Sequence, residues 1–132
     1  MAAIKGKDTQ PEVIVRGTVH AMGYRYRLHF KSLPGTPDLV FPGRRKIIEV
    51  RGCFWHRHPG CFRAATPGTR WEFWQAKFQA TLDRDARNLA SLEAAGWTIM
   101  VVWECEVKDR NLADRLRDFL GPKGSAAPPN MV

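Results

Sequence analysis

The amino-acid sequence predicts an α/β domain in which a mixed β-sheet is flanked by helices. The first observation is the order of the expected elements: a helix, three short strands, a long helix, an apolar strand and a last helix. Such an order is typical of layered α/β architectures. The second is the length of 132 residues, which suits a single domain. The third is the composition, 44% hydrophobic and 26% charged, which excludes collagen-like, disulfide-dense and wholly disordered chains.

The first element is an expected helix that begins after Thr9. Thr9 is a good N-cap residue, Pro11 is tolerated in a first helical turn, and Glu12 lies three positions after the cap. The apolar spacing continues to about Met22, where Gly23 ends the helix.

Three short strands follow. Residues 24–30 alternate between apolar and polar types and predict the first strand, and residues 32–37 are rich in turn-forming types. Residues 38–41 and 46–50 predict two more strands, joined by a hairpin turn at residues 42–45.

The longest helical pattern covers residues 71–95 and ends at Gly96. Its apolar positions form one stripe at helical spacing: Phe78, Leu82, Leu89 and Leu92. Asp85 falls in the middle of this stripe, and an acid on a buried helix face needs a partner, a metal or a catalytic role.

The last elements close the domain. Residues 97–103 are too apolar for a surface element and predict a central strand, and residues 111–120 predict a helix. Residues 121–132 are rich in Gly, Pro, Ser and Ala and predict a disordered tail. We therefore expect one domain over residues 1–120.

The charge balance favours a polyanionic partner. Lys and Arg number 21 against 13 Asp and Glu, which leaves a net charge of +8, and nucleic acid is the leading candidate for such a chain. Cations alternate with aromatic residues at positions 24–27 and again in the run Phe54, Trp55, His56 and Arg57. Arg pairs with phosphate and rings stack on bases. An amphipathic strand with its rings inward remains the simpler alternative for residues 24–27.

Residues 51–70 show no regular period, and a loop of this length needs something that holds it. Three cysteines, an odd number, argue against a disulfide framework. With one histidine they make a candidate tetrahedral Zn²⁺ set: Cys53, His58, Cys61 and Cys105. Buried free thiols with a surface histidine are the alternative.

Two carboxylates could converge across the expected hairpin. Asp38 follows a proline at the start of one strand and Glu49 ends the next, two residues before Arg51. Paired carboxylates suit Mg²⁺, which can activate water at a phosphodiester. The pattern resembles the PD-(D/E)xK nuclease core, with Arg51 in place of the usual lysine; a turn-flanking Asp and a surface ion pair are the alternative. His56 is a candidate acid–base or phosphate-binding group, or an exposed histidine without a role.

Taken together, these segments resemble the very-short-patch repair (Vsr-type) DNA mismatch endonucleases from about Lys7 to Leu120. The matching landmarks, given as runs in this sequence, are Asp8-Thr9-x-Pro11-Glu12, Leu33-Pro34-Gly35-x-Pro37-Asp38, Gly52-Cys53-Phe54-Trp55-His56, Glu72-Phe73-Trp74, Arg84-Asp85, Gly96-Trp97 and Trp103-Glu104-Cys105.

The resemblance implies a restriction-endonuclease-like fold and an enzyme that nicks one strand 5′ to the thymine of a T:G mismatch. Asp38 matches the family's essential metal-binding aspartate, and His56 matches its catalytic histidine. Asp85 matches an acid that supports this histidine, and Glu12 matches an acidic residue near the active site.

The resemblance also assigns the remaining candidates. The four Cys and His residues named above match the structural Zn²⁺ ligands, and Phe54, Trp55 and Trp74 match aromatic residues that wedge into the duplex beside the mismatch. Intercalation costs a few kcal/mol of unstacking, which is least at a mispaired step.

One departure from the family concerns Glu49 and Arg51. Vsr-type enzymes generally have a histidine where this chain has Arg51 and an apolar residue where it has Glu49. We predict that Glu49 is a direct Mg²⁺ ligand here and that Arg51 stabilises phosphate charge. The same departure bears on whether specificity for the mismatch is kept.

The sequence therefore predicts a Mg²⁺-dependent, Zn²⁺-stabilised endonuclease that nicks double-stranded DNA at T:G mismatches. The alternatives are a restriction-like nuclease with another recognition site and an inactive, zinc-stabilised DNA-binding module. No stretch approaches the roughly 20 apolar residues of a membrane helix, and the first residues lack a signal-peptide core. We expect a bacterial cytoplasmic protein that acts at the nucleoid, and cooperation with mismatch-repair proteins stays open.

Overall fold

A four-stranded mixed sheet forms the centre of the molecule. The computed structural model describes residues 9–65 and 67–121. The strands are β1 (Arg27–Leu28), β2 (Leu39–Phe41), β3 (Lys46–Arg51) and β4 (Thr98–Trp103), and they lie in the order β1-β2-β3-β4. The first two pairings are antiparallel, and β3 pairs with β4 in parallel. A parallel pair needs a long crossover connection, which a helix supplies here.

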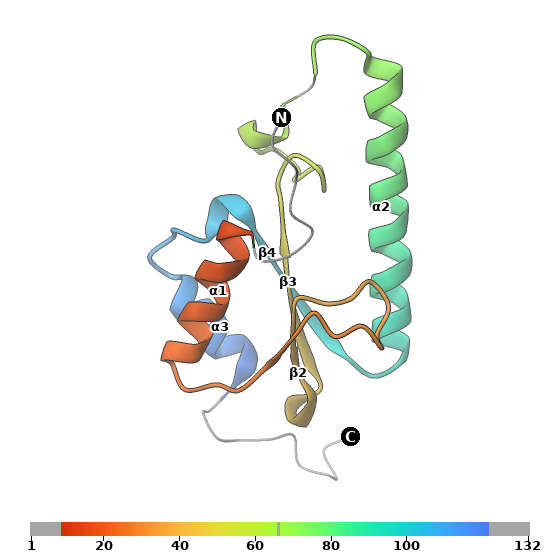
Figure 1. Cartoon of the computed structure of the whole chain (residues 1–132). Helices are drawn as coiled ribbons and strands as arrows, with labels where there is room; N and C mark the ends of the chain where they lie inside the picture. The colour runs from red at the N-terminus through yellow and green to blue at the C-terminus, as the bar shows by residue number, and fades with distance from the viewer. Residues whose placement is uncertain (1–8, 66, 122–132) are drawn as a thin grey trace.

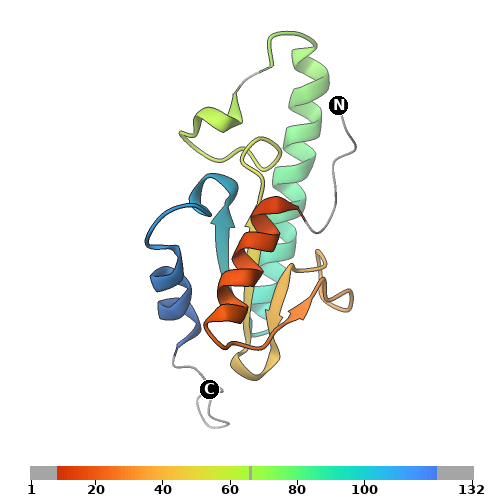
Figure 2. The ribbon, with the colours of Figure 1, turned by 60° about the vertical axis from the view of Figure 1, so that its left-hand side comes forward.

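Helices cover both faces of the sheet, as expected. Helices α1 (Gln10–Ala21) and α3 (Leu112–Leu120) pack together on one face, and the long helix α2 (Trp71–Ala94) lies on the other (Figures 1 and 2). The larger apolar core lies under α1 and α3, and the smaller one lies under α2, where Leu92 packs on Val40 and Ile47. The observed order of helices and strands agrees with the sequence prediction.

Helix α1 begins as its sequence predicts. The Thr9 hydroxyl accepts a hydrogen bond from the Glu12 N–H at 3.4 Å, which satisfies one of the free N–H groups of the first turn. Val15 and Val19 are fully buried and attach the helix to the sheet. This cap and these contacts fix where Glu12 lies.

The first strand is much shorter than the expected residues 24–30. Regular pairing is limited to Arg27 and Leu28, and His29 has a positive φ of 46°, which ends the extended conformation. Tyr24 instead turns into the core, where its hydroxyl donates to the Gly121 carbonyl at 2.5 Å. Arg25 and Arg27 are exposed while Tyr24 is buried, so the simpler amphipathic interpretation of this segment holds.

The expectation of a central strand at residues 97–103 is also wrong. Strand β4 lies at an edge of the described sheet, with β3 as its neighbour. Its apolar composition has another cause, since Met100 and Val102 pack in the core under α1 and α3 while Ile99 packs in the core under α2. An edge strand that is covered on both faces can be as apolar as a central one.

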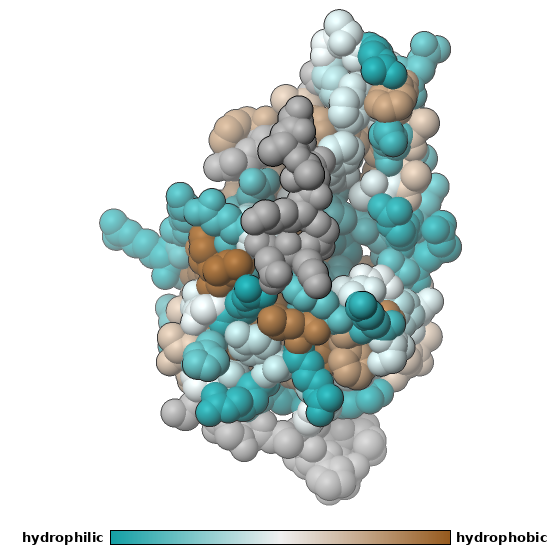
Figure 3. All heavy atoms as spheres, in the orientation of Figure 1, coloured by the Kyte–Doolittle hydropathy of each residue, from teal (hydrophilic) through white to brown (hydrophobic). Residues whose placement is uncertain are grey.

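The apolar stripe of α2 is only partly buried. Phe78 and Leu92 are buried, whereas 39% of Leu82 is exposed. The N-terminal half of α2 extends past the sheet beside the irregular loop (Figure 1), so part of its stripe has no sheet to cover it. On the face shown in Figure 3, hydrophilic side chains cover most of the described surface and hydrophobic residues form small separate patches.

Three consecutive cations in and after the β2–β3 turn cap the two C-terminal helix ends. Arg44 donates to the Leu120 carbonyl and Arg45 to the Ala95 carbonyl, each at 2.7 Å, and the Lys46 ammonium donates to the Phe119 carbonyl. Cations are favourable at helix C-termini. The expected turn therefore links the helices on both faces of the sheet.

The disordered tail that the sequence predicts lies almost entirely outside the described residues. Its residues 122–132 lie outside the part of the chain that the structure describes. Within the described part, none of the helices is long and apolar enough to cross a membrane.

Candidate functional site

A cleft of about 970 Å³ opens between the start of α1, the end of β3 and the middle of α2. All six residues that the sequence nominates for catalysis line it: Glu12, Asp38, Glu49, Arg51, His56 and Asp85. They come from separate parts of the chain, so the fold brings them together at one concave site. Such a convergence of polar groups in a cleft is the usual form of an active site.

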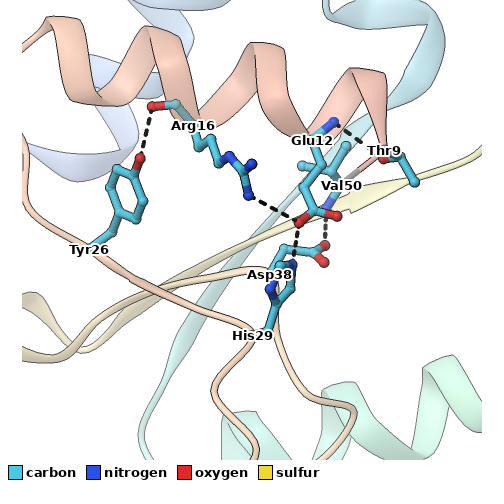
Figure 4. A network of polar contacts seen from close by, with 7 residues as sticks. All are labelled: Thr9, Glu12, Arg16, Tyr26, His29, Asp38 and Val50. Carbon is cyan, nitrogen blue, oxygen red and sulfur yellow. Dashed lines mark hydrogen bonds and ion pairs between the residues drawn. The ribbon is translucent and has the colours of Figure 1, made fainter. Parts of the chain in front are cut away.

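Asp38 lies at the entry to β2 and is the most strongly perturbed acid in the cleft. One of its carboxylate oxygens accepts a hydrogen bond from the Val50 N–H at 2.7 Å (Figure 4). The pKa of Asp38 is raised to about 7. Burial is the largest cause, the nearby carboxylates of Glu12 and Glu49 add to the rise, and the Val50 hydrogen bond and His29 oppose it. A carboxylate in this setting gains from a bound cation.

Glu12 is 3% exposed and contacts a residue that the sequence did not nominate. Its Oε2 meets the Nε2 of His29 and lies 3.9 Å from the Arg16 guanidinium (Figure 4). His29 was missed because it reads as an ordinary position of an alternating strand. The bend at its positive φ has no sequence signal comparable to a glycine.

Glu49 and Arg51 leave the end of β3 on the same side of the sheet. Glu49 Oε1 lies 3.0 Å from Arg51 Nη2, and both side chains are about 15% exposed. Glu49 lines the cleft together with Asp38, which suits the oxygen ligands that Mg²⁺ prefers. The donor atoms closest together around Asp38, however, are those of Glu12 and His29, all within 4.8 Å of one another.

His56 and Asp85 belong to different elements and are in direct contact. His56 belongs to the loop after β3, Asp85 lies on α2, and the His56 Nδ1 and Asp85 Oδ2 atoms are 2.6 Å apart. This contact gives the acid in the middle of the apolar stripe a partner. It also orients the ring, because a bond at Nδ1 leaves Nε2 as the second functional nitrogen.

A tight turn closes the cleft next to α2. Gly35 has a φ of +77°, and a Cβ at this position would lie 2.7 Å from the Nδ2 atom of Asn88. The turn therefore needs glycine both for its backbone conformation and for its close approach to α2. It holds the segment that leads into Asp38 against the helix that carries Asp85.

Four aromatic rings pack beside the cleft. The ring centroids of Phe54, Trp55 and Trp74 lie 5.2–5.7 Å apart. The ring of the buried Phe78 packs against all three. The three nominated rings remain partly exposed, and Trp55 also lines the cleft. The aromatic cluster is thus continuous with the candidate active site.

Arg57, nominated as a DNA contact, is engaged inside the loop. Its guanidinium donates to the carbonyls of Phe54 at 3.2 Å and Ala64 at 2.8 Å, and its Cζ lies 4.0 Å from the centre of the Phe78 ring. These contacts hold the loop against the aromatic cluster.

The irregular loop and the end of β4 together form a candidate metal centre. The Sγ atoms and the histidine Nδ1 of four residues lie within 4.8 Å of one another: Cys53, His58, Cys61 and Cys105. The His58 Nδ1 is 3.6 Å from Cys53 Sγ and 3.4 Å from Cys105 Sγ. Tetrahedral Zn²⁺ with bonds of about 2.3 Å to sulfur and 2.0–2.1 Å to nitrogen places such atoms about 3.6 Å apart. The donor set and its spacing therefore fit Zn²⁺.

The surroundings of the metal centre connect it with the cleft. The His58 ring stacks on Trp103, with centroids 4.2 Å apart. Glu104 lines the cleft, and its Oε1 accepts a hydrogen bond from the Cys53 N–H at 3.3 Å. Burial, with the neighbouring thiols, raises the pKa of Cys105 to about 12, so ionised thiols here call for a cation.

Comparisons with known proteins identify relatives of this chain. A family model described as DNA mismatch endonuclease Vsr matches residues 1–62. The chain is 49% identical to the type II nicking enzyme V.XorIIP of Xanthomonas oryzae, over 92% of this chain and 90% of that protein. It is 35% identical to the DNA mismatch endonuclease Vsr of Escherichia coli, over 96% and 85%, and 37% identical to the type II nicking enzyme V.NmeAIP of Neisseria meningitidis, over 83% and 78%.

The mixed sheet, the polar cleft and these relatives define a DNA-nicking endonuclease. The chain belongs to the Vsr DNA mismatch endonuclease family, which confirms the resemblance found in the sequence and implies the restriction-endonuclease-like fold. Its named relatives are bacterial.

Proposed function

We propose that this enzyme nicks one strand of double-stranded DNA 5′ to the thymine of a T:G mismatch, with Mg²⁺ as cofactor. The observation that carries the proposal is the meeting of the His56–Asp85 pair with Asp38 in one cleft, beside the aromatic cluster. A charge of +8 over the whole chain favours the approach of a polyanion.

Each polar group of the cleft has a distinct task in phosphodiester hydrolysis. Asp38 and Glu49 would hold Mg²⁺. When bound, this ion would activate water and stabilise the charge of the phosphate. The Arg51 guanidinium stabilises the phosphate oxygens. Asp85 holds His56 through Nδ1, and the His56 Nε2 accepts a proton from the attacking water. The water oxygen forms a bond to phosphorus, and the bond between phosphorus and the 3′ oxygen breaks. A proton ends on that 3′ oxygen.

The aromatic cluster supplies a means of recognising the mismatch. Phe54, Trp55 and Trp74 are partly exposed and packed on one another, so they form a stiff wedge. Separating a base step costs a few kcal/mol and least at a mispaired step. A wedge beside the cleft therefore favours cleavage at such steps.

The decisive experiment is strand nicking on an end-labelled duplex with one T:G mismatch, run beside its matched T:A duplex. We expect a nick beside the thymine that needs Mg²⁺, and intact matched DNA. Cleavage of both duplexes at equal rates would support a nuclease activity and exclude specificity for the mismatch. Linear product from a plasmid would indicate a restriction-like enzyme that cuts both strands.

Two substitutions test the metal ligands. Asp38→Asn should abolish nicking, and Glu49→Gln should lower it at least tenfold because both carboxylates are assigned to Mg²⁺. Full activity of Glu49→Gln together with loss in Asp38→Asn would exclude Glu49 as a ligand. Mismatch DNA binding by Asp38→Asn without added Mg²⁺ is the control for folding.

A second candidate function is nicking within a different recognition sequence. It is favoured by two relatives that are named type II nicking enzymes rather than mismatch endonucleases. A set of duplexes with randomised flanking bases, each made with the T:G mismatch and with the matched T:A pair, separates the two. Cleavage that needs the mismatch fits the first function, whereas cleavage of one matched sequence fits the second. The inactive DNA-binding alternative loses support because the relatives named above are nicking enzymes and a mismatch endonuclease.

We further propose that residues 1–120 form the single catalytic domain and that Zn²⁺ at the Cys/His cluster is structural. Four protein donors leave a tetrahedral ion without an open position for substrate. Its task would be to hold the loop that carries His56 and the aromatic wedge.

A further inference from the structure

We propose that Glu12, His29 and Asp38 form a second divalent-cation position in the cleft, with one nitrogen donor, suited to Mn²⁺ and similar transition-metal ions. The inference shares Asp38 with the proposed function and goes beyond it by adding His29 as a ligand. The three donor atoms lie within 4.8 Å of one another. Donors at about 2.1 Å from one ion lie about 3–4 Å apart, so small side-chain shifts suffice.

Each of the three side chains is held in place by other contacts (Figure 4). Glu12 lies in the capped first turn of α1, and Asp38 is fixed by the Val50 N–H. The His29 backbone N–H donates to the Asp38 carbonyl at 3.0 Å, which keeps its ring beside that residue. The donor atoms thus come from the start of α1 and from two paired segments, those of His29 and Asp38, that the backbone hydrogen bond joins.

The charges around this position favour a cation. Glu12 and Asp38 face each other with Glu49 nearby, and their mutual repulsion adds to the cost of burying them. Arg16 reaches Glu12 at 3.9 Å, which is too distant for a hydrogen bond. A divalent ion between the carboxylates would offset the repulsion that these contacts leave.

The imidazole decides which ion fits. Mg²⁺ takes oxygen ligands and keeps several waters, whereas Mn²⁺ and later transition ions accept an imidazole nitrogen as well as carboxylates. The two metal positions therefore differ in their donor atoms. The position between Asp38 and Glu49 offers only oxygens, whereas the position between Asp38, Glu12 and His29 adds a nitrogen. The competing interpretation is that His29 holds Glu12 as an ion pair and never binds a metal.

The test uses the full-length, Zn²⁺-loaded protein without DNA and with Mn²⁺ as the probe. Electron spin-echo envelope modulation of bound Mn²⁺ should show a coupled ¹⁴N nucleus, and this signal should change to that of ¹⁵N when the histidines are ¹⁵N-labelled. The labelling experiment involves no substitution, so folding of a variant cannot confuse it. Bound Mn²⁺ with no histidine nitrogen signal would overturn the proposal.

Two variants assign the nitrogen. His29→Gln should remove the nitrogen signal and weaken Mn²⁺ binding at least about tenfold, whereas His56→Gln is the matched control and should keep the signal. Loss of the signal in His56→Gln and its survival in His29→Gln would place the ion elsewhere and overturn the assignment.

The outcome is separable from that of the proposed function. Mn²⁺ spectroscopy reports the position in the absence of DNA, and mismatch nicking with Mg²⁺ is measured on its own. If Mn²⁺ is coordinated by nitrogen but the protein does not distinguish mismatched from matched DNA, the metal position is supported and the proposed specificity is contradicted. If the protein nicks at mismatches but bound Mn²⁺ shows no nitrogen coupling, the specificity is supported and the metal position is contradicted.

Discussion

At the scale of single residues, the surroundings of Asp38 shift its pKa in both directions. Burial and two neighbouring carboxylates favour its protonated form, while the Val50 N–H and His29 favour the ionised form. Burial is the largest of these effects and sets the result. The same environment that makes the ionised carboxylate costly also makes it a strong ligand for a cation.

The pKa of Asp38 predicts a pH-dependent stability before Mg²⁺ is added. The folded-state pKa of about 7 lies above the ordinary value of 3.8 for an aspartate, so the folded protein holds this proton more tightly. The free energy of unfolding should therefore fall between about pH 4 and pH 7 by this contribution, and Mg²⁺ should restore stability most above pH 7. Urea unfolding of the Zn²⁺-loaded protein, compared with Asp38→Asn, measures it; an equal pH slope in both proteins would contradict the prediction.

The contact between His56 and Asp85 predicts an ordered pair of losses. His56→Ala should lower the nicking rate by about 10²–10⁴, the usual contribution of an acid–base group. Asp85→Asn should lower it less, since Asp85 acts through the orientation of the ring. Single-turnover rates on saturating mismatch DNA check the order, and equal binding affinity of both variants is the control. A larger loss in Asp85→Asn than in His56→Ala would contradict these roles.

At the scale of elements, α2 is the helix that joins the cleft to the aromatic wedge. Asp85 and Asn88 face the cleft, while Trp74 and Phe78 pack in the aromatic cluster. Helix α2 therefore carries residues of both the cleft and the aromatic cluster. The turn at Gly35 approaches this helix closely at Asn88.

The turn at Gly35 offers a test of that close approach. Gly35→Ala should destabilise the protein by about 1 kcal/mol or more, because alanine is strained at positive φ and its Cβ would meet Asn88. An Asn88→Ala background removes the two shortest contacts, at 2.7 and 3.1 Å, and leaves the backbone strain and a Cβ contact at 3.3 Å, so the loss should be smaller. Urea unfolding of the four proteins measures the coupling, and a coupling of zero would show that the contact does not matter.

Sequence patterns predicted the elements whose signals are local. The cap at Thr9 and the Cys/His spacing in the loop each depend on neighbouring residues, and both agree with the structure. The early end of the first strand and the edge position of β4 depend on packing between distant segments. His29 lies at a bend with a positive φ and lines the cleft, and neither its type nor its spacing marked it as a site residue.

At the scale of the whole molecule, the net charge overstates the charge available to DNA. Arg44, Arg45 and Lys46 donate to helix C-terminal carbonyls, and Arg57 is engaged within its loop. These cations stabilise the fold and lie in fixed positions. Phosphate contacts should come more from cations near the cleft, such as the exposed Arg84.

The salt dependence of DNA binding tests this division of charge. Each phosphate contact contributes about 0.9 to the slope of log affinity against log salt concentration. Arg84→Gln should reduce the slope by about one such step, whereas the control Arg45→Gln should leave the slope unchanged and lower the stability. Fluorescence anisotropy at several salt concentrations measures both, and an equal fall of slope in the two variants would contradict the division.

The placement of Cys105 apart from the other three metal ligands has a consequence for the unfolded chain. An ion held by Cys53 and Cys105 links two points separated by a long stretch that contains α2 and β4. Such a link acts as a removable crosslink: closing a loop of about 50 residues lowers the entropy of the unfolded ensemble by an amount worth about 4 kcal/mol. Metal supply would then control the survival of the protein in the cell as well as the shape of its loop.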